Sequence, residues 1–145
     1  CAIEPEDRTI IIDWCYDICD KFRYDRETVI IAISILDRFM SKCNGLQQSD
    51  LLQDHVKYQL VAVSSLYIAI KFNEHTSVSS DNLSKLSQGT YTKAEIEDME
   101  NKILHTLSWR VCPPTSLQIG YPLRVDFICY RRHRWGSHLK SVGKQ

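Results

Sequence analysis

The hydrophobic pattern of the chain is helical almost from its first residues. Between residues 5 and 22, most apolar side chains fall on one arc of a helix drawn at about 100° per residue, and most charged side chains occupy the opposite arc. Pro5 suits the first turn of such a helix. Arg8 lies inside the apolar arc, and a guanidinium in that position requires a partner of opposite charge.

A second helix is predicted over residues 26–41, with Asp25 as its N-cap. Glu27 lies in its first turn, where the helix dipole favours an anion. Apolar residues surround most of the circumference, so this helix is expected to be largely buried. Asp37 lies among these apolar residues and is the candidate partner of Arg8.

The polar stretch 42–52 contains an Asn-Gly step and predicts a loop. A third helix follows over residues 54–73. Its uncharged run of 13 residues, 58–70, mixes large apolar side chains with Ala and Ser. Small side chains let neighbouring helices approach from several sides, so this helix is predicted to be the central one. The run ends at Lys71.

Two further helices are predicted in the second half of the chain. Residues 81–88 indicate a short helix with Ser80 as its candidate cap, and Gly89 ends it. Residues 92–95, Thr-Lys-Ala-Glu, match a capping box, whose side chains satisfy free backbone donors where a helix begins. In this fifth helix Glu100 falls within the apolar arc.

Composition and charge narrow the class of protein. The 145 residues fit one ordinary domain, and 43% hydrophobic with 25% charged residues is typical of a soluble globular chain. Residues 1–123 carry 12 basic and 17 acidic side chains, which argues against nucleic-acid binding by this part. Residues 124–145 carry 6 and 1. For this basic end, nucleic-acid contact, an import signal and a disordered solvated tail stay open.

No catalytic, metal or cofactor motif is apparent in the sequence. The five His show no HExxH spacing and the six Cys form no CxxC pair, and neither GxSxG nor a glycine-rich phosphate loop occurs. Cys15 and Cys19 lie one turn apart on the buried arc and are expected to be core residues. The longest uncharged run is short of the roughly 20 residues of a membrane span. We expect a non-enzyme without cofactor or metal, in the nucleus, the cytoplasm or both.

The charges on apolar faces are the most informative anomalies. The pair predicted between the first two helices would be internal and architectural. For Lys71 and Glu100 two interpretations stay open. They pair with each other internally, or they lie at a rim between the third and fifth helices and offer charged hydrogen bonds to a partner protein. In the second case Phe72 and Leu104 would supply apolar contacts around them.

Several stretches in the same order resemble the N-terminal cyclin box of the cyclin family. The resemblance spans residues 5–117, about four fifths of the chain, and implies an all-α fold, a five-helix cyclin-box bundle around a central third helix. Residues 118–145 would form an irregular basic tail. The matching stretches are RTIIIDW (8–14), ETVIIAISILDRFMS (27–41), YQLVAVSSLYIAIKFNE (58–74), YTKAEIEDMENKILHTLSW (91–109) and PPT (113–115).

The resemblance implies a regulatory subunit that binds and activates a cyclin-dependent serine/threonine protein kinase by positioning the kinase's αC helix. The family's internal Arg–Asp pair maps onto Arg8 and Asp37. Its kinase-binding Lys and Glu map onto Lys71 and Glu100.

The resemblance also marks a candidate docking patch for kinase substrates or inhibitors at Ile10, Ile11 and Trp14, where Asp7 occupies the family's usual leading Met position. After residue 117 the family continues its helix and often adds a second box, so this chain either has a single box or is truncated. The alternative function is a transcription-factor-IIB-like cyclin-fold module that binds DNA or transcription machinery. A helical enzyme would need convergent titratable groups, which the sequence does not show.

Overall fold

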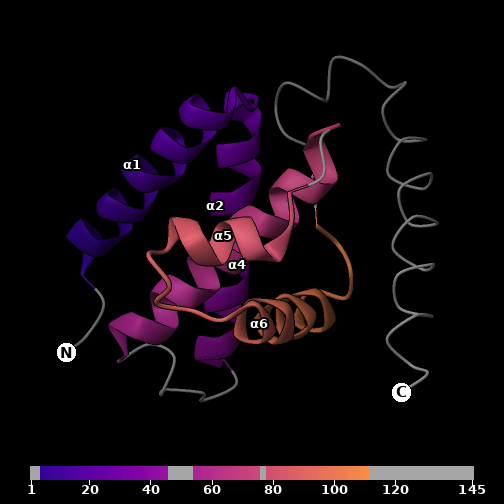
Figure 1. Ribbon diagram of the computed structural model, residues 1–145. Coiled ribbons are helices and arrows are strands. Elements are labelled where there is room, and N and C mark those ends of the chain that lie inside the picture. The colour runs from indigo at the N-terminus through magenta and orange to yellow at the C-terminus, as the bar shows by residue number, and fades with distance from the viewer. Residues whose placement is uncertain (1–3, 46–53, 76–77, 112–145) are drawn as a thin grey trace. The chain divides into compact units, whose positions relative to one another are not determined.

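The structure, a computed structural model, describes residues 4–45, 54–75 and 78–111, all within one compact unit of residues 1–112. These residues form helices and no strand (Figure 1). The predicted all-α class is confirmed. None of these helices is both long and apolar enough to span a membrane. The five helices are α1 (Pro5–Phe22), α2 (Arg26–Gly45), α4 (His55–Asn73), α5 (Ser80–Leu86) and α6 (Lys93–Thr106).

Local capping explains where most helices begin. Pro5 opens α1, and the Asp54 carboxylate accepts hydrogen bonds from the first backbone N–H groups of α4. The Thr92 hydroxyl accepts from the Glu95 N–H, while the Glu95 carboxylate accepts from the Thr92 N–H at 2.7 Å. This is the capping box predicted from the sequence. It lowers the pKa of Glu95, because the Thr92 N–H and the Thr92 hydroxyl both donate to the Glu95 carboxylate and favour its charged form.

The boundaries of α2 and α5 differ from the predictions, and α5 ends at Leu86 instead of at residue 88. Helix α2 continues through Gly45 instead of ending near residue 41, because Cys43 is 1% exposed in the core and the Lys42 ammonium donates to the Thr106 carbonyl at 3.0 Å. These tertiary contacts extend the helix across residues with weak helical preference. Ser79, and not Ser80, caps α5. The rest of the predicted loop, the last residues of the cyclin-box resemblance and the basic tail lie outside the described residues.

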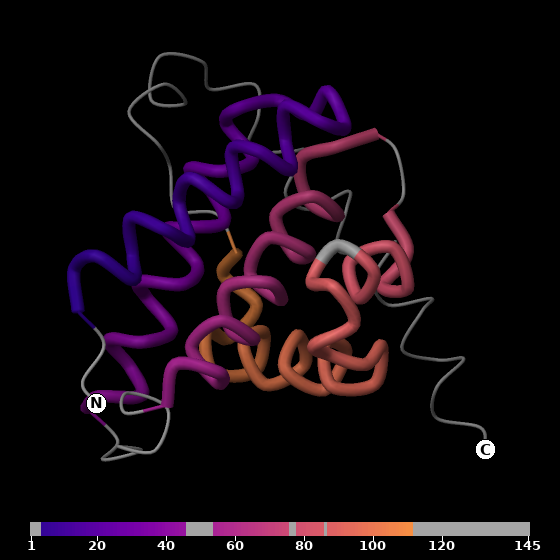
Figure 2. The backbone as a smooth tube through the Cα atoms, turned by 60° about the vertical axis from the view of Figure 1, so that its left-hand side comes forward, coloured from indigo at the N-terminus to yellow at the C-terminus, as the bar shows by residue number. Residues whose placement is uncertain are grey.

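Helix α4 lies at the centre of the bundle, as the sequence predicts. The other four helices all contact it, and Figure 2 shows it running between the α1–α2 pair and the α5–α6 pair. Every side chain of residues 61–70 is buried. Ala62, Ser64 and Ala69 leave room for close approach of the neighbouring helices. The Ser64 hydroxyl lies 3.4 Å from the Ile96 carbonyl of α6.

A cluster of buried side chains joins α4 to α5 and α6. Trp14 of α1, Leu60 and Val78 pack against this cluster. The Tyr91 hydroxyl donates to the Val56 carbonyl at 2.8 Å, which ties the segment before α6 to the first turn of α4. Burial raises the pKa of Tyr91. The α4–α6 contact therefore contains one buried cluster, made of Val63, Tyr67, Leu83, Tyr91 and Ile96.

Candidate functional site

Lys71 of α4 and Glu100 of α6, which the sequence singles out, lie close together beside this buried cluster. Lys71 lies in the last turn of α4 and Glu100 in the middle of α6. The Lys71 Nζ is 2.7 Å from the Glu100 Oε1, and the two side chains are 24% and 8% exposed. The same ammonium lies over the ring of Tyr67, 4.3 Å from its centroid. Tyr67 lies one helical turn before Lys71 on α4.

Of the two interpretations left open for Lys71 and Glu100, the structure realises the internal pair. The expectation that only a partner protein satisfies the two charges is therefore wrong for the chain by itself. Glu100 is buried, and a buried carboxylate is costly without a cation. Lys71 supplies that cation. Lys71 nevertheless retains an exposed fraction three times that of Glu100, so the pair reaches the surface on its lysine side.

The two apolar residues expected beside this pair have different positions. Phe72 is half-buried at the end of α4, next to Lys71. Leu104 is only 1% exposed and belongs to the core. The expectation that Leu104 offers surface to a partner is wrong, because one helical turn after Glu100 the side chain faces the interior of the bundle.

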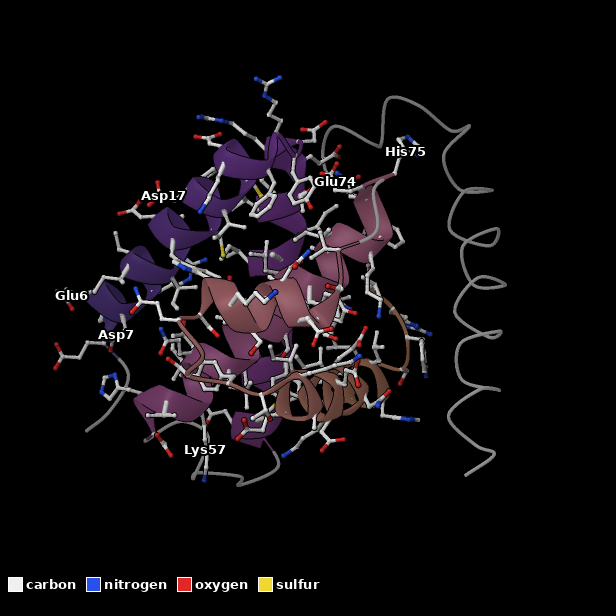
Figure 3. The ribbon with its side chains drawn as sticks, in the orientation of Figure 1. Glu6, Asp7, Asp17, Lys57, Glu74 and His75 are labelled. Atoms are coloured by element: carbon white, nitrogen blue, oxygen red, sulfur yellow. The ribbon has the colours of Figure 1, made fainter. Side chains whose placement is uncertain are left out.

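A polar cluster just beyond Lys71 fixes the end of α4, and it could not be predicted from the sequence. The Glu74 carboxylate accepts hydrogen bonds from the Asp25 backbone N–H at 2.9 Å and from the buried Thr28 hydroxyl. The Asn73 side-chain amide donates to the Thr28 hydroxyl oxygen at 2.9 Å. Figure 3 shows Glu74 beside the start of α2. No short-range pattern signals this contact, because its partners lie 45 to 49 residues away along the chain.

Arg8 and Asp37 are brought together as the sequence predicts, but not in the interior. The guanidinium donates to both carboxylate oxygens, at 3.2 and 2.8 Å. Asp37 thereby raises the pKa of Arg8. The side chains are 45% and 49% exposed, so the expected burial of the pair is wrong. Both residues lie at the edge of the α1–α2 contact, where water still reaches them.

The candidate docking patch on α1 is only partly on the surface. Ile10 is 66% exposed and Trp14 is half-buried one turn later, whereas Ile11 is 6% exposed and belongs to the core. The assignment of Ile11 to an exposed patch is therefore wrong. The Asp7 carboxylate lies 3.4 Å from the His55 Nδ1 of α4, and Asp7 precedes Ile10 by three residues on α1, so the two share one side of that helix.

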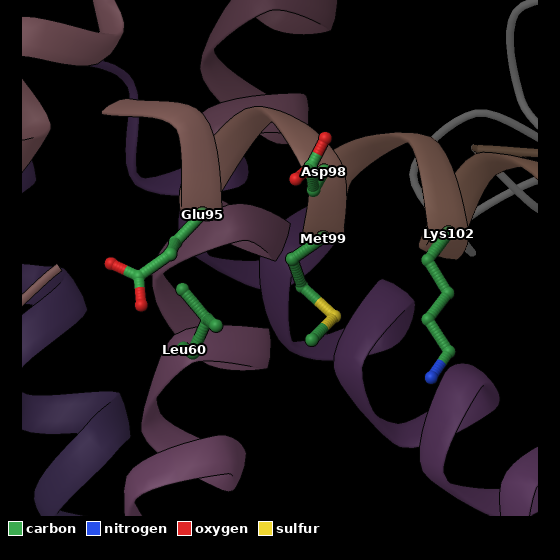
Figure 4. Close-up of a pocket in the computed structure, with 5 residues that line it drawn as sticks. All are labelled: Leu60, Glu95, Asp98, Met99 and Lys102. Atoms are coloured by element: carbon green, nitrogen blue, oxygen red, sulfur yellow. The ribbon is translucent and has the colours of Figure 1, made fainter. Parts of the chain in front are cut away.

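An open depression lies between α4 and α6, away from the Lys71–Glu100 pair. Leu60 and Met99 form its apolar part, and three charged side chains surround them (Figure 4). Charges of both signs border it, so it does not favour a strongly charged ligand. The charged residues are Glu95, Asp98 and Lys102.

The described residues hold no arrangement typical of catalysis or metal binding. Among them, no group of three or more His, Cys, Asp or Glu side chains lies close enough to hold a metal ion. Burial raises the pKa of Cys15 to about 12 and that of Cys19 to about 11. These thiols stay protonated near neutral pH and are poor nucleophiles there.

Known proteins are similar to this chain over most of its length. The family described as "Cyclin, N-terminal domain" matches residues 2–112. The chain is 34% identical to the G2/mitotic-specific cyclin-B1 of Xenopus laevis over 93% of its own length and 32% of that relative. It is 33% identical to the G2/mitotic-specific cyclin-A of Drosophila melanogaster over 75% of its length and 21% of the relative. For the G1/S-specific cyclin-E1 of Gallus gallus, the identity is 32% over 78% of the chain and 26% of the relative.

Proposed function

Because the chain belongs to the cyclin family, we propose that it is a regulatory subunit that binds and activates a cyclin-dependent serine/threonine protein kinase in cell-cycle control. The observation that carries this proposal is the family match over residues 2–112, which contains all five helices. The chain spans between 21% and 32% of the length of the three relatives compared, so the proposal concerns the box itself.

The proposed mechanism is a population shift in the kinase. The cyclin surface would hold the kinase's αC helix inward, so that its Glu pairs with the ATP-orienting Lys and the activation loop leaves the substrate cleft. Moving a kinase from 1:99 to 99:1 active requires a preference of about 5.5 kcal/mol for the active arrangement. Catalysis then belongs to the kinase, and the complex would act in the nucleus, the cytoplasm or both.

We assign the docking of the kinase to the α4–α6 end that carries Lys71, Glu100 and Phe72. The internal pairing of the two charges supports this assignment on a basis different from the one expected from the sequence. A pair that is already neutralised costs less to cover than two separate ions, because most of its water has already been removed. The partly exposed Lys71 ammonium would then donate to backbone carbonyls of the kinase, and Phe72 would supply apolar area.

A second contact region is proposed on α1. Ile10 and Trp14 would form an apolar ridge that binds short segments of kinase substrates or inhibitors. The Asp7–His55 pair beside it would favour segments with a polar or basic residue at that point. Exchange of Ile10 for Ser should then weaken substrate recruitment and leave kinase binding unchanged.

The decisive experiment measures kinase activation by the 145-residue chain. Each member of a panel of purified, monomeric cyclin-dependent kinases is mixed with wild type, Lys71→Met or Lys93→Met, and histone phosphorylation is recorded. Lys93 is the matched control, because it forms an exposed ion pair with Glu97 on α6, the helix that also carries Glu100. We expect Lys71→Met to weaken activation about tenfold or more and Lys93→Met to leave it within about twofold.

Two results would contradict the proposal. If wild type neither binds nor activates any kinase of the panel, the regulatory function itself is wrong. If wild type activates a kinase and both variants do so equally, the function stands and the assignment of the docking site to Lys71 is wrong. Circular dichroism of each variant establishes that the folded fraction is the same.

A further inference from the structure

The position of Tyr67 points to a role for its aromatic ring that the family match does not contain. Tyr67 and Lys71 lie four residues apart on α4, so their side chains share one face of the helix. The Lys71 ammonium lies 4.3 Å from the centroid of the ring and 2.7 Å from the Glu100 carboxylate. The cation is thus held by an aromatic face of its own helix and by an anion of α6.

We propose that Tyr67 is a positioning residue for kinase docking, which holds the Lys71 ammonium in the orientation that the kinase contacts. This inference rests on the function and docking site proposed above and deepens them. The attraction between a cation and the negative face of an aromatic ring grows when both are partly removed from water. Here the ring is 6% exposed and the lysine side chain 24% exposed, so the contact is mostly shielded.

The ring can position the lysine because it is itself immobile. Tyr67 belongs to the buried cluster with Leu83, Tyr91 and Ile96, which packs α5 and α6 against α4. A lysine side chain has many rotamers, and restricting them before binding reduces the entropy lost when a partner binds. The packing of α5 and α6 thereby sets the geometry of a charge that lies at the surface.

Glu100 alone would not confer the same orientation. A carboxylate attracts an ammonium over a wide range of directions, whereas a ring face attracts it only from above the plane. With both present, the ammonium is restricted to positions that satisfy the ring contact and the carboxylate contact together. Loss of the ring would leave the ion pair formed but less defined, and only a fraction of molecules would present the lysine as the kinase requires.

A partner-free measurement tests the contact first. A proton above an aromatic ring resonates upfield, so the ε-methylene protons of Lys71 should be shifted upfield in wild type and in Tyr67→Phe, and should lose this shift in Tyr67→Leu. Ordinary ε-proton positions in wild type would overturn the proposal. If Tyr67→Leu does not fold, the ε-proton shifts of folded wild type and Tyr67→Phe are compared with those of the urea-unfolded chain. Unfolding separates the ring from Lys71, so the upfield shift should be present only in the two folded proteins.

A double-mutant cycle then tests the positioning role. We expect Tyr67→Leu to weaken binding of the best kinase of the panel about 3- to 30-fold, and Tyr67→Phe to change it less than about twofold. In a Lys71→Met background, Tyr67→Leu should cause no further loss, because there is no cation left to position.

An equal loss in the Lys71→Met background would show that Tyr67 acts only through the core, and the proposal would be wrong. Unchanged binding by Tyr67→Leu, or an equal loss in Tyr67→Phe, would also overturn it. If Lys71→Met alone binds like wild type, the proposed docking site fails and this inference falls with it, while the proton shifts report separately whether the ring contact exists.

Discussion

Two ion pairs of the molecule have almost the same N–O distance in different surroundings. The Arg8–Asp37 pair joins α1 to α2 at 2.8 Å with both side chains about half exposed. The Lys71–Glu100 pair joins α4 to α6 at 2.7 Å, and Glu100 is only 8% exposed. Distance therefore does not distinguish the two pairs, whereas access of water does.

This difference determines what each pair contributes. An exposed pair gains little, because water screens the attraction and solvates either ion when the other is removed. In a buried pair each ion depends on its partner, so breaking the pair is far more costly than its net contribution suggests. Architecture by itself explains the α1–α2 pair. In the Lys71–Glu100 pair the ammonium is partly exposed, and buried residues around it determine its position. A docking site requires this combination.

The largest effect is expected from Lys71→Met. This change leaves the Glu100 carboxylate in the interior without its ammonium, and we expect a loss of about 3 kcal/mol in the free energy of unfolding. Urea unfolding followed by circular dichroism measures it. A loss below about 1 kcal/mol would mean that water or other groups compensate Glu100, and the two pairs would then be equivalent.

Glu100→Gln should cost less, about 1 kcal/mol, although it breaks the same pair. The amide still accepts a hydrogen bond, and the partly exposed Lys71 turns toward water when the carboxylate charge is gone. The same urea experiment makes this comparison within one pair. A cost equal to or above that of Lys71→Met would contradict the view that Glu100 is the dependent partner.

Arg8→Ala is expected to lower the free energy of unfolding by at most about 1 kcal/mol. A fully buried pair would have cost about 3 to 5 kcal/mol, which the exposure of Arg8 and Asp37 excludes. Arg8→Lys is a suitable control, since it retains the charge but not the two parallel hydrogen bonds. Unfolding of the Arg8→Ala variant at room temperature would show that the structure underestimates this contact.

The smallest effect is that of salt. In 1 M NaCl the screening length falls to about 3 Å, so the cost of Arg8→Ala should shrink to a few tenths of a kcal/mol. The cost of Lys71→Met should stay nearly constant, because salt does not enter the interior around Glu100. Urea unfolding of both variants at low and high salt provides the test. An equal salt dependence would remove the distinction between the pairs.

Features that depend on near neighbours could be predicted from the sequence. The start of α6 follows from Thr92 and Glu95, which satisfy each other's backbone groups within one turn. The bounds of α1 agree with those predicted from its apolar arc. The end of α2 could not be predicted in this way, because Cys43 and Lys42 continue the helix through contacts with the core and with α6.

The candidate site was predictable only in part, for the same reason. The sequence singles out Lys71 because it ends the uncharged run of the third helix, and Glu100 because helical spacing places it in an apolar arc. Spacing does not reveal which of the two interpretations is correct. Helical spacing also does not reveal the contact of Glu74 with Asp25 and Thr28, because Glu74 is far from both of them along the chain.

The sequence by itself determined the helical class, the capping box of α6 and which face of each amphipathic helix is apolar, because these properties depend on residues within about one turn of each other. Only the tertiary structure decided how deeply each charge is buried. Arg8 and Glu100 both lie in apolar arcs, yet one reaches water and the other does not. Burial depends on what the neighbouring helix places opposite a side chain, and no local pattern carries that information.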